Sequence, residues 1–355
     1  MADTPEPVPV DTSQVSAAFD RRKTIIGTVV TLLVLAVVFV GIIPKFGSYA
    51  DAWAEIQQMS ARSLVALGLS VLVTILIFVL PYQAAIPGLR YGPGFTIRQT
   101  SFTISNAVPA GGAVGLAMQY VMLASYGFGT GPATAGIAVT SIWSLLMTLT
   151  LPVLGVLAAL TTGSLEQRWI WVAAAGLAAT VITIVALWLI LRSEPSARKV
   201  GGWGQRLIEP LNRRRANPWD ATGMVLDLRN STSSVLLTRW RWVTASNYLV
   251  VLAQFSVLWF AIKGVGGTGA DGLSLAGAFA AFAISRMASM IPLTPGGLGT
   301  VDAALVALLV TFGLPESVAL AATLVWRAAS FIPQVCLGII TFLMWRVRQV
   351  RAGRI

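Results

Sequence analysis

Long runs of apolar residues dominate this chain of 355 residues and decide what it can fold into. An α-helix needs roughly 20 apolar residues to cross a bilayer, and six runs reach that length. They cover residues 24–43, 63–82, 133–160, 169–191, 241–262 and 317–345. Two further apolar segments, 99–125 and 272–312, are interrupted in the middle by Pro and Gly. We therefore predict an all-α polytopic membrane protein with about six full spans and two broken, re-entrant hairpins.

The residue counts exclude several kinds of chemistry. The chain has no His and a single Cys, Cys336. Ser-His-Asp triads, His-ligated metals, disulfides and Cys-based redox or zinc sites are therefore impossible. We expect no catalytic residues, no metal and no cofactor, and we do not expect an enzyme.

The basic residues indicate how the chain crosses the membrane. There are 25 Lys and Arg against 14 Asp and Glu, and most of them lie between the apolar runs. This pattern indicates that the basic residues set the membrane topology and contact anionic lipid, rather than bind nucleic acid. If the N-terminus is cytoplasmic and each interrupted segment returns to its own side, 19 basic residues, Arg98 among them, are cytoplasmic and only 4 lie outside. The positive-inside rule then predicts that both termini are cytoplasmic.

The two interrupted segments also indicate an internal repeat. The tetrapeptide Phe102–Ser105 resembles Phe282–Ser285, and each precedes a Pro-Gly turn. Each half also has a Trp and a Gly separated by 12 positions, Trp143 with Gly155 and Trp326 with Gly338. The first hairpin would enter from the cytoplasm and the second from outside, which makes the repeat inverted. Inverted repeats with broken helices are typical of transporters.

On this basis we divide the chain into four parts. They are a disordered cytoplasmic tail (1–20), a first membrane half (21–191), a basic cytoplasmic loop (192–240) and a second membrane half with a PGGLG break (241–355). Within the loop, Asn217-Pro218 predicts the start of a helix, because Asn is a good N-cap and Pro suits the first helical position.

The break in the second half is the most informative motif. Pro295, Gly296, Gly297 and Gly299 cannot continue a regular helix. Their backbone groups cannot face lipid, so the break is buried in protein or lines a polar cavity. A helix that restarts near Leu298 would direct its N-terminal amides into the membrane interior, where they could bind an anion. The alternative is a purely structural kink.

Three charged residues surround this break: Arg286, Asp302 and Arg327. Charges within membrane helices are costly, so these must be paired or hydrated. Asp302 can neutralise only one arginine, and the other could bind a phosphate through its planar fork. Alternatively, Asp302 forms a structural pair with one arginine while the other reaches toward the interface.

The first half has no charge at the equivalent break. Its polar side chains are those of Asn106 and Gln119, with Gln83 nearby in sequence. Such amides either belong to a binding site or only hold helices together by hydrogen bonds.

Arg286, the turn from Pro292 to Asp302 with its PGGLG core, Gly313 and Arg327 together resemble the signature of the lysylphosphatidylglycerol synthase transmembrane region. This flippase-like family comprises bacterial and archaeal inner-membrane proteins. The family usually has Glu after the turn, where this chain has Asp302. Larger members add a soluble aminoacyl-transferase domain, which we do not expect in this protein, so lysyl transfer is not implied.

The resemblance implies that the protein moves an anionic phospholipid or a polyprenyl-phosphate-linked lipid between the leaflets of the inner membrane. The expected headgroup site comprises the three charges, the glycines of the break and the amide of the first half. These residues are Arg286, Arg327, Asp302, Gly296, Gly297, Gly299 and Asn106.

Two other functions stay open. The chain could be a non-transporting accessory subunit that scaffolds a membrane glycosyltransferase or a lipid-modifying enzyme, or it could itself be an integral-membrane enzyme that acts on a lipid. Its expected partners are the anionic lipid and the membrane, with either a second copy of the chain or a glycosyltransferase as protein partner. Nucleic acid is not expected.

Overall fold

The computed structural model of the protein describes residues 48–107, 111–161, 167–212, 220–270, 272–290 and 297–352. Within these ranges the chain is almost entirely helical and contains no strand. This confirms the all-α prediction. The predicted tail at 1–20 and the predicted first span at 24–43 lie outside the described residues.

Four stretches of helix are long and apolar enough to cross a membrane. They are Ala61–Ala85, formed by α4 (Ala61–Ile77) with α5 (Leu80–Ala85), then α8 (Thr130–Leu160), the part Thr238–Gly266 of α11 (Ala221–Gly266), and α14 (Glu316–Arg351). Each covers a predicted span. The remaining predicted span, 169–191, forms α9 (Gln167–Arg192).

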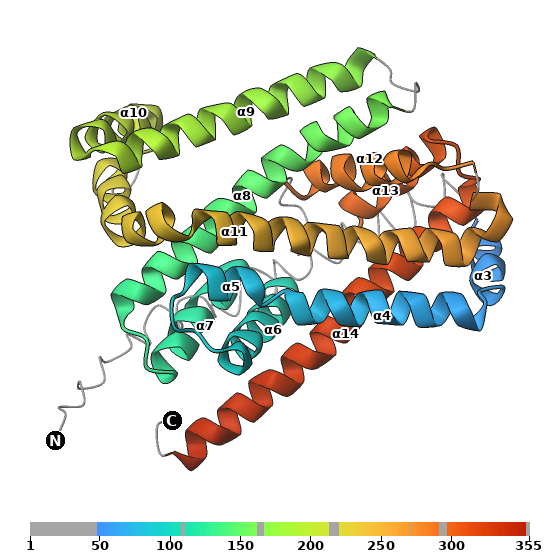
Figure 1. The fold of residues 1–355 in the computed structure, drawn as a ribbon, viewed down its shortest axis with the longest axis horizontal. Coiled ribbons are helices and arrows are strands. Elements are labelled where there is room, and N and C mark those ends of the chain that lie inside the picture. The colour runs from blue at the N-terminus through green and yellow to red at the C-terminus, as the bar shows by residue number, and fades with distance from the viewer. Residues whose placement is uncertain are drawn as a thin grey trace.

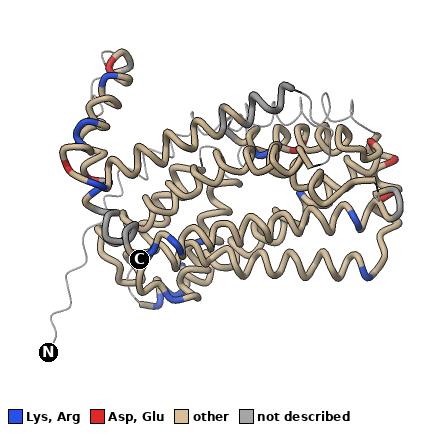
Figure 2. Tube along the Cα trace, turned by 45° about the horizontal axis from the view of Figure 1, so that its top comes forward, with Lys and Arg blue, Asp and Glu red and all other residues tan. Residues whose placement is uncertain are grey.

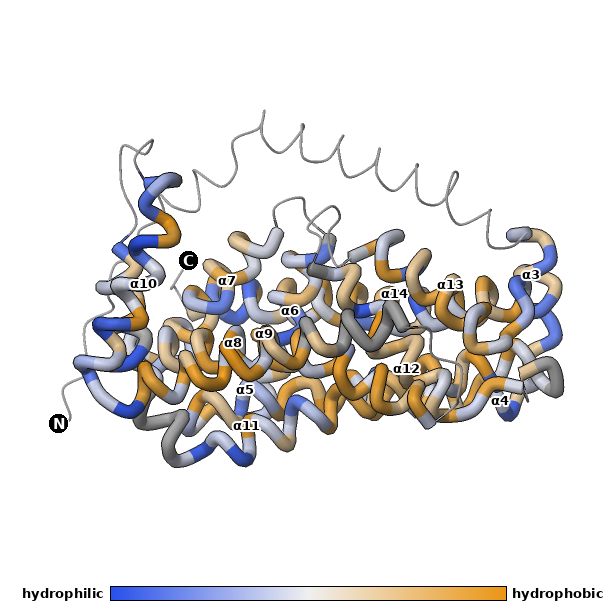
Figure 3. The backbone as a smooth tube through the Cα atoms, turned by 90° about the horizontal axis from the view of Figure 1, so that it is seen from above, coloured by the Kyte–Doolittle hydropathy of each residue, from blue (hydrophilic) through white to orange (hydrophobic). Residues whose placement is uncertain are grey.

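Large apolar side chains on the outer faces of these helices are exposed. Those of α4 include Val65 and Leu69, and those of α9 include Ile182 and Trp188. Figure 3 shows that hydrophobic residues predominate along the middle of the bundle, whereas hydrophilic residues are frequent near α10 and α3 at its two ends. Because a soluble protein rarely exposes so many contiguous apolar side chains, this surface fits contact with lipid.

The two interrupted segments form helical hairpins, as predicted. The first consists of α6 (Tyr91–Ala107) and α7 (Gly111–Ser125). The second consists of α12 (Leu275–Ser285), the 3-10 turn η4 (Arg286–Met290) and α13 (Thr300–Thr311). The bases of the two hairpins lie at opposite ends of the bundle (Figure 1). The hairpins therefore enter from opposite sides, as an inverted repeat requires.

Each hairpin packs against a long helix of the other half of the chain. Helix α8 packs along α12, and α14 packs along α6. At both contacts the long helix approaches through a glycine of the repeat. A Cβ on Gly155 would lie 2.9 Å from the Cβ of Ala283, and one on Gly338 would overlap the Oγ1 of Thr103. Gly155 and Gly338 therefore have the same structural role in the two halves: each lets its helix approach the opposite hairpin closely.

The described parts of the basic segment 192–240 are largely helical. Helix α10 (Glu194–Asn212) covers its first part, and α11 begins at Ala221. Asp220 caps α11 by accepting the N–H of Gly223, and Gln205 of α10 accepts the N–H of Ala221 at 2.8 Å. The predicted helix start at Asn217-Pro218 lies outside the described residues.

Basic residues mark one end of the bundle. They gather at the end that carries α10 and the end of α14, whereas the opposite end carries α3 (Tyr49–Gln57) and the short turn η3 (Gly267–Ala270) (Figure 2). We call the first of these the basic end. The basic end corresponds to the predicted cytoplasmic side.

Cysteine labelling tests this topology. Cys336 is exposed and is first replaced by Ala. Single cysteines are then placed at Thr130, at the base of the first hairpin, and at Gly272, before the second; both positions are exposed. In intact cells a membrane-impermeant thiol reagent should label Gly272→Cys and not Thr130→Cys. Labelling of both positions from the same side would contradict the inverted repeat.

Candidate functional site

The carboxylate of Asp302 organises the end of the broken segment. Asp302 lies in the first turn of α13, and its Oδ2 accepts the backbone N–H of Gly299 at 2.8 Å. An acidic side chain at this position stabilises the start of a helix, because it satisfies an N–H that has no partner within the helix. The N-terminal amides of α13, which we predicted to be available to an anion, are thus partly satisfied by the protein itself.

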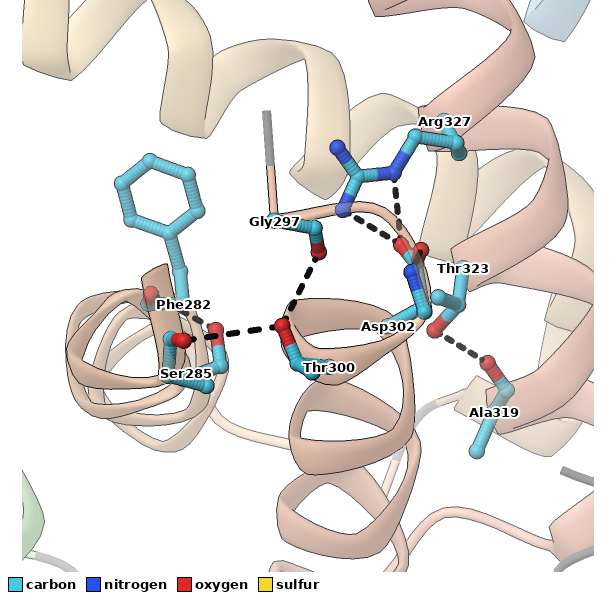
Figure 4. A network of polar contacts seen from close by, with 10 residues as sticks. Phe282, Ser285, Gly297, Thr300, Asp302, Ala319, Thr323 and Arg327 are labelled. Carbon is cyan, nitrogen blue, oxygen red and sulfur yellow. Dashed lines mark hydrogen bonds and ion pairs between the residues drawn. The ribbon is translucent and has the colours of Figure 1, made fainter. Parts of the chain in front are cut away.

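The other oxygen of Asp302 forms an ion pair with Arg327 of α14. The Nε and Nη2 atoms of Arg327 both lie 2.6 Å from Oδ1 (Figure 4). The Asp302 side chain is only 2% exposed, and that of Arg327 is 14% exposed. Asp302 therefore binds the backbone of the hairpin and the neighbouring helix at the same time. Of the two pairings that the sequence left open, the structure contains the one with Arg327.

The glycines of the break have conformations that favour glycine. Gly297 and Gly299 have φ values of 65° and 85°. The carbonyl of Gly297 accepts a hydrogen bond from the Thr300 hydroxyl at 3.3 Å (Figure 4). Gly296 lies outside the described residues.

A cavity of about 410 Å³ lies beside this ion pair, and we call it the central cavity. Arg286 and Gly297 line it from the second hairpin, Asn106 from the first, and Arg327 from α14. Asn106 and Arg286 each directly follow the tetrapeptide that the two halves share, so the repeat brings equivalent positions to one cavity. Of the predicted site residues, these four line the cavity, while Asp302 and Gly299 act through their contacts with Arg327 and the hairpin backbone.

Arg286 differs from Arg327 in its partners. Its guanidinium lies over the ring of Phe282, with its Cζ 5.3 Å from the ring centroid. Among the described residues it forms no ion pair. Arg286 is therefore the arginine whose charge is not balanced by Asp302.

A second cavity of about 530 Å³ lies toward the basic end, and we call it the basic-side cavity. Its lining includes Tyr82 of α5, Arg98 of α6, Gln119 of α7, Ser144 of α8 and Asn247 of α11. Gln254 and Arg286 line both cavities, so they mark the point where the two meet. No Asp or Glu lines either cavity within the described part of the chain.

The family comparison agrees with this architecture. A family model described as the lysylphosphatidylglycerol synthase TM region matches residues 24–338. The chain belongs to this family. The match covers both hairpins and every predicted site residue. A search of curated proteins finds no match to the chain.

In this member of the lysylphosphatidylglycerol synthase transmembrane family, the sequence analysis missed several polar residues of the cavities, among them Gln254 and Arg98. Gln254 is an isolated amide in an apolar span, a signal that we applied only to Asn106, Gln119 and Gln83. Arg98 was placed in a cytoplasmic segment, and this is wrong. Helix α6 already begins at Tyr91, so Arg98 lies two turns inside it and is only 7% exposed.

The turn at Gly297 yields a testable prediction. A Cβ at this position would lie 2.8 Å from Cγ2 of Val301, in a backbone conformation that costs an L-residue roughly 1–2 kcal/mol. Gly297→Ala should therefore lower the free energy of unfolding by at least that amount, measured by SDS titration of the purified protein. Gly112, near the start of α7, is the matched control, because a Cβ there meets no atom within 4 Å. Equal effects of the two substitutions would contradict a strained turn.

The ion pair yields a second prediction. Asp302→Asn and Arg327→Gln each leave one buried group without its partner, which typically costs about 3–5 kcal/mol. The double variant should recover part of this loss, so the unfolding free energies should show a coupling between the two sites. Additive effects of the two substitutions would show that the pair does not stabilise the hairpin.

Proposed function

We propose that the protein translocates lipids with an anionic phosphate headgroup between the two leaflets of the membrane. The single observation that carries this proposal is the state of the two central arginines. Asp302 is occupied by Arg327 and by the Gly299 N–H, which leaves the guanidinium of Arg286 in a cavity without a carboxylate among the described lining residues.

A guanidinium in this position suits a phosphate. Its planar fork matches two phosphate oxygens, and such charge-assisted hydrogen bonds are about twice as strong as neutral ones. The arrangement does not suit a purely cationic group, because the carboxylate of Asp302 already has two partners. The cavity volume also lies within the range of about 300–1,000 Å³ that is usual for small-ligand sites.

The position of Arg286 suits transport rather than static binding. It lines the central cavity and the basic-side cavity, so a headgroup bound to it could be reached from either one. The acyl chains would stay in the bilayer, beside the exposed apolar faces of α4 and α14. We further propose that the protein lies in the inner membrane with the basic end in the cytoplasm, in accordance with the positive-inside rule.

Leaflet exchange in liposomes tests the proposal. The purified protein is reconstituted with fluorescent phosphatidylglycerol, and exchange is followed by reduction of the outer-leaflet label with dithionite. Arg286→Gln should slow exchange about tenfold or more, because the charged partner of the phosphate is lost. Arg286→Lys keeps the positive charge but lacks the planar fork, so its exchange rate should lie between those of wild type and Arg286→Gln.

Arg198→Gln is the matched control. Arg198 lies on α10, where its side chain is 61% exposed and pairs with Glu194. The Arg198→Gln variant should exchange lipid at the wild-type rate. If the wild-type protein exchanged no phosphate lipid at all, the role of accessory subunit would be favoured instead. Equal rates for wild type and Arg286→Gln would show that Arg286 does not bind the headgroup.

A further inference from the structure

A second buried arginine, Arg98, has no carboxylate partner among the described residues. It lies on α6 of the first hairpin. Its Nη2 donates one long hydrogen bond of 3.4 Å to Oε1 of Gln334, whereas its Nη1 is buried and has no hydrogen-bond partner within the described structure. A guanidinium carries five N–H donors, and a buried charge with so few partners is costly.

Two aromatic rings hold this guanidinium. Its Cζ lies 4.1 Å from the ring centroid of Phe78 and 4.7 Å from that of Phe102. Cation–π contacts of this kind favour a positive charge but supply no carbonyl or carboxylate oxygen to its N–H donors. The rings therefore hold the side chain in place, while the buried Nη1 keeps its donors for a ligand.

The described residues that line the cavity around Arg98 include many polar side chains and no acid. Arg98 lines the basic-side cavity together with hydroxyl and amide groups, which include those of Thr140, Ser144 and Asn247. Within the part of the chain that the structure describes, the other charged residue that lines this cavity is Arg286. With Arg327 neutralised by Asp302, the two cavities carry a formal charge of about two positive units from Arg98 and Arg286. A phosphate is the complement that this arrangement lacks.

We propose that Arg98 forms a second anion-binding site, which takes the phosphate of a lipid headgroup on the basic side before or after it binds at Arg286. This inference rests on the proposed function, because it adds a second position to the same route. The bond from Arg98 to Gln334 connects this site to a residue that lines the central cavity.

Binding at equilibrium tests the proposal without transport. The full-length protein in neutral detergent is titrated calorimetrically with dihexanoyl phosphatidylglycerol, a water-soluble short-chain lipid. Wild type should bind two molecules, whereas Arg98→Gln and Arg286→Gln should each bind one and the double variant none. Arg198→Gln serves again as the exposed control and should bind two. Unchanged binding by Arg98→Gln would overturn the proposal, since Arg98 would then only hold the hairpin through its aromatic contacts.

Two further measurements keep the test decisive. If Arg98→Gln does not fold, Arg98→Lys keeps the charge between the rings, and its binding at this site should weaken about tenfold while its melting temperature stays close to that of wild type. A parallel titration with inorganic phosphate identifies the source of the anion. If Arg98→Gln lost only inorganic phosphate binding and kept both lipid molecules, the lipid assignment would be overturned.

The two proposals can fail separately. Normal lipid exchange together with unchanged binding by Arg98→Gln would refute the second site alone. Loss of one bound lipid in Arg98→Gln, in a protein that exchanges no lipid, would refute the proposed transport and leave the anion site in place.

Discussion

The arrangement of the second hairpin depends on one carboxylate in the middle of the membrane protein. One oxygen of Asp302 satisfies the backbone where α13 begins, and the other neutralises Arg327 of α14. A broken helix in the membrane needs partners for its backbone groups, and a buried arginine needs an opposite charge. Asp302 meets both needs at once. It is thereby unavailable to a ligand, and the positive charge that remains at the centre is that of Arg286.

Much of the fold could be predicted from the sequence, because a bilayer allows few solutions. The apolar runs predicted the long helices, and the Pro and Gly interruptions predicted both hairpins. The equal spacing of Trp and Gly in the two halves indicated the repeat, and the structure shows that Gly155 and Gly338 bring α8 and α14 close to the opposite hairpins. These features follow from local composition and from the requirement to satisfy backbone groups, so they can be read from sequence.

The choice of partners within the site could not be predicted, because it depends on side-chain geometry. The sequence allowed Asp302 to pair with Arg286 or Arg327, and only the packing of α13 beside α14 decides between them. Arg98 was assigned to a cytoplasmic segment because the predicted apolar segment began one residue after it. The structure extends α6 back to Tyr91 and places Arg98 between Phe102, one turn further along the same helix, and Phe78. No spacing in the sequence indicates the contact with Phe78.

The central claim is that unbalanced arginine charge in the cavities selects lipids by the net charge of the headgroup. The most direct measurement compares exchange of fluorescent phosphatidylglycerol, a net anion, with that of phosphatidylcholine, a zwitterion, in the same liposomes with the wild-type protein. The account predicts protein-dependent exchange of phosphatidylglycerol and little exchange of phosphatidylcholine, whose cationic end would be repelled by the arginines. Equal rates for the two lipids would contradict it.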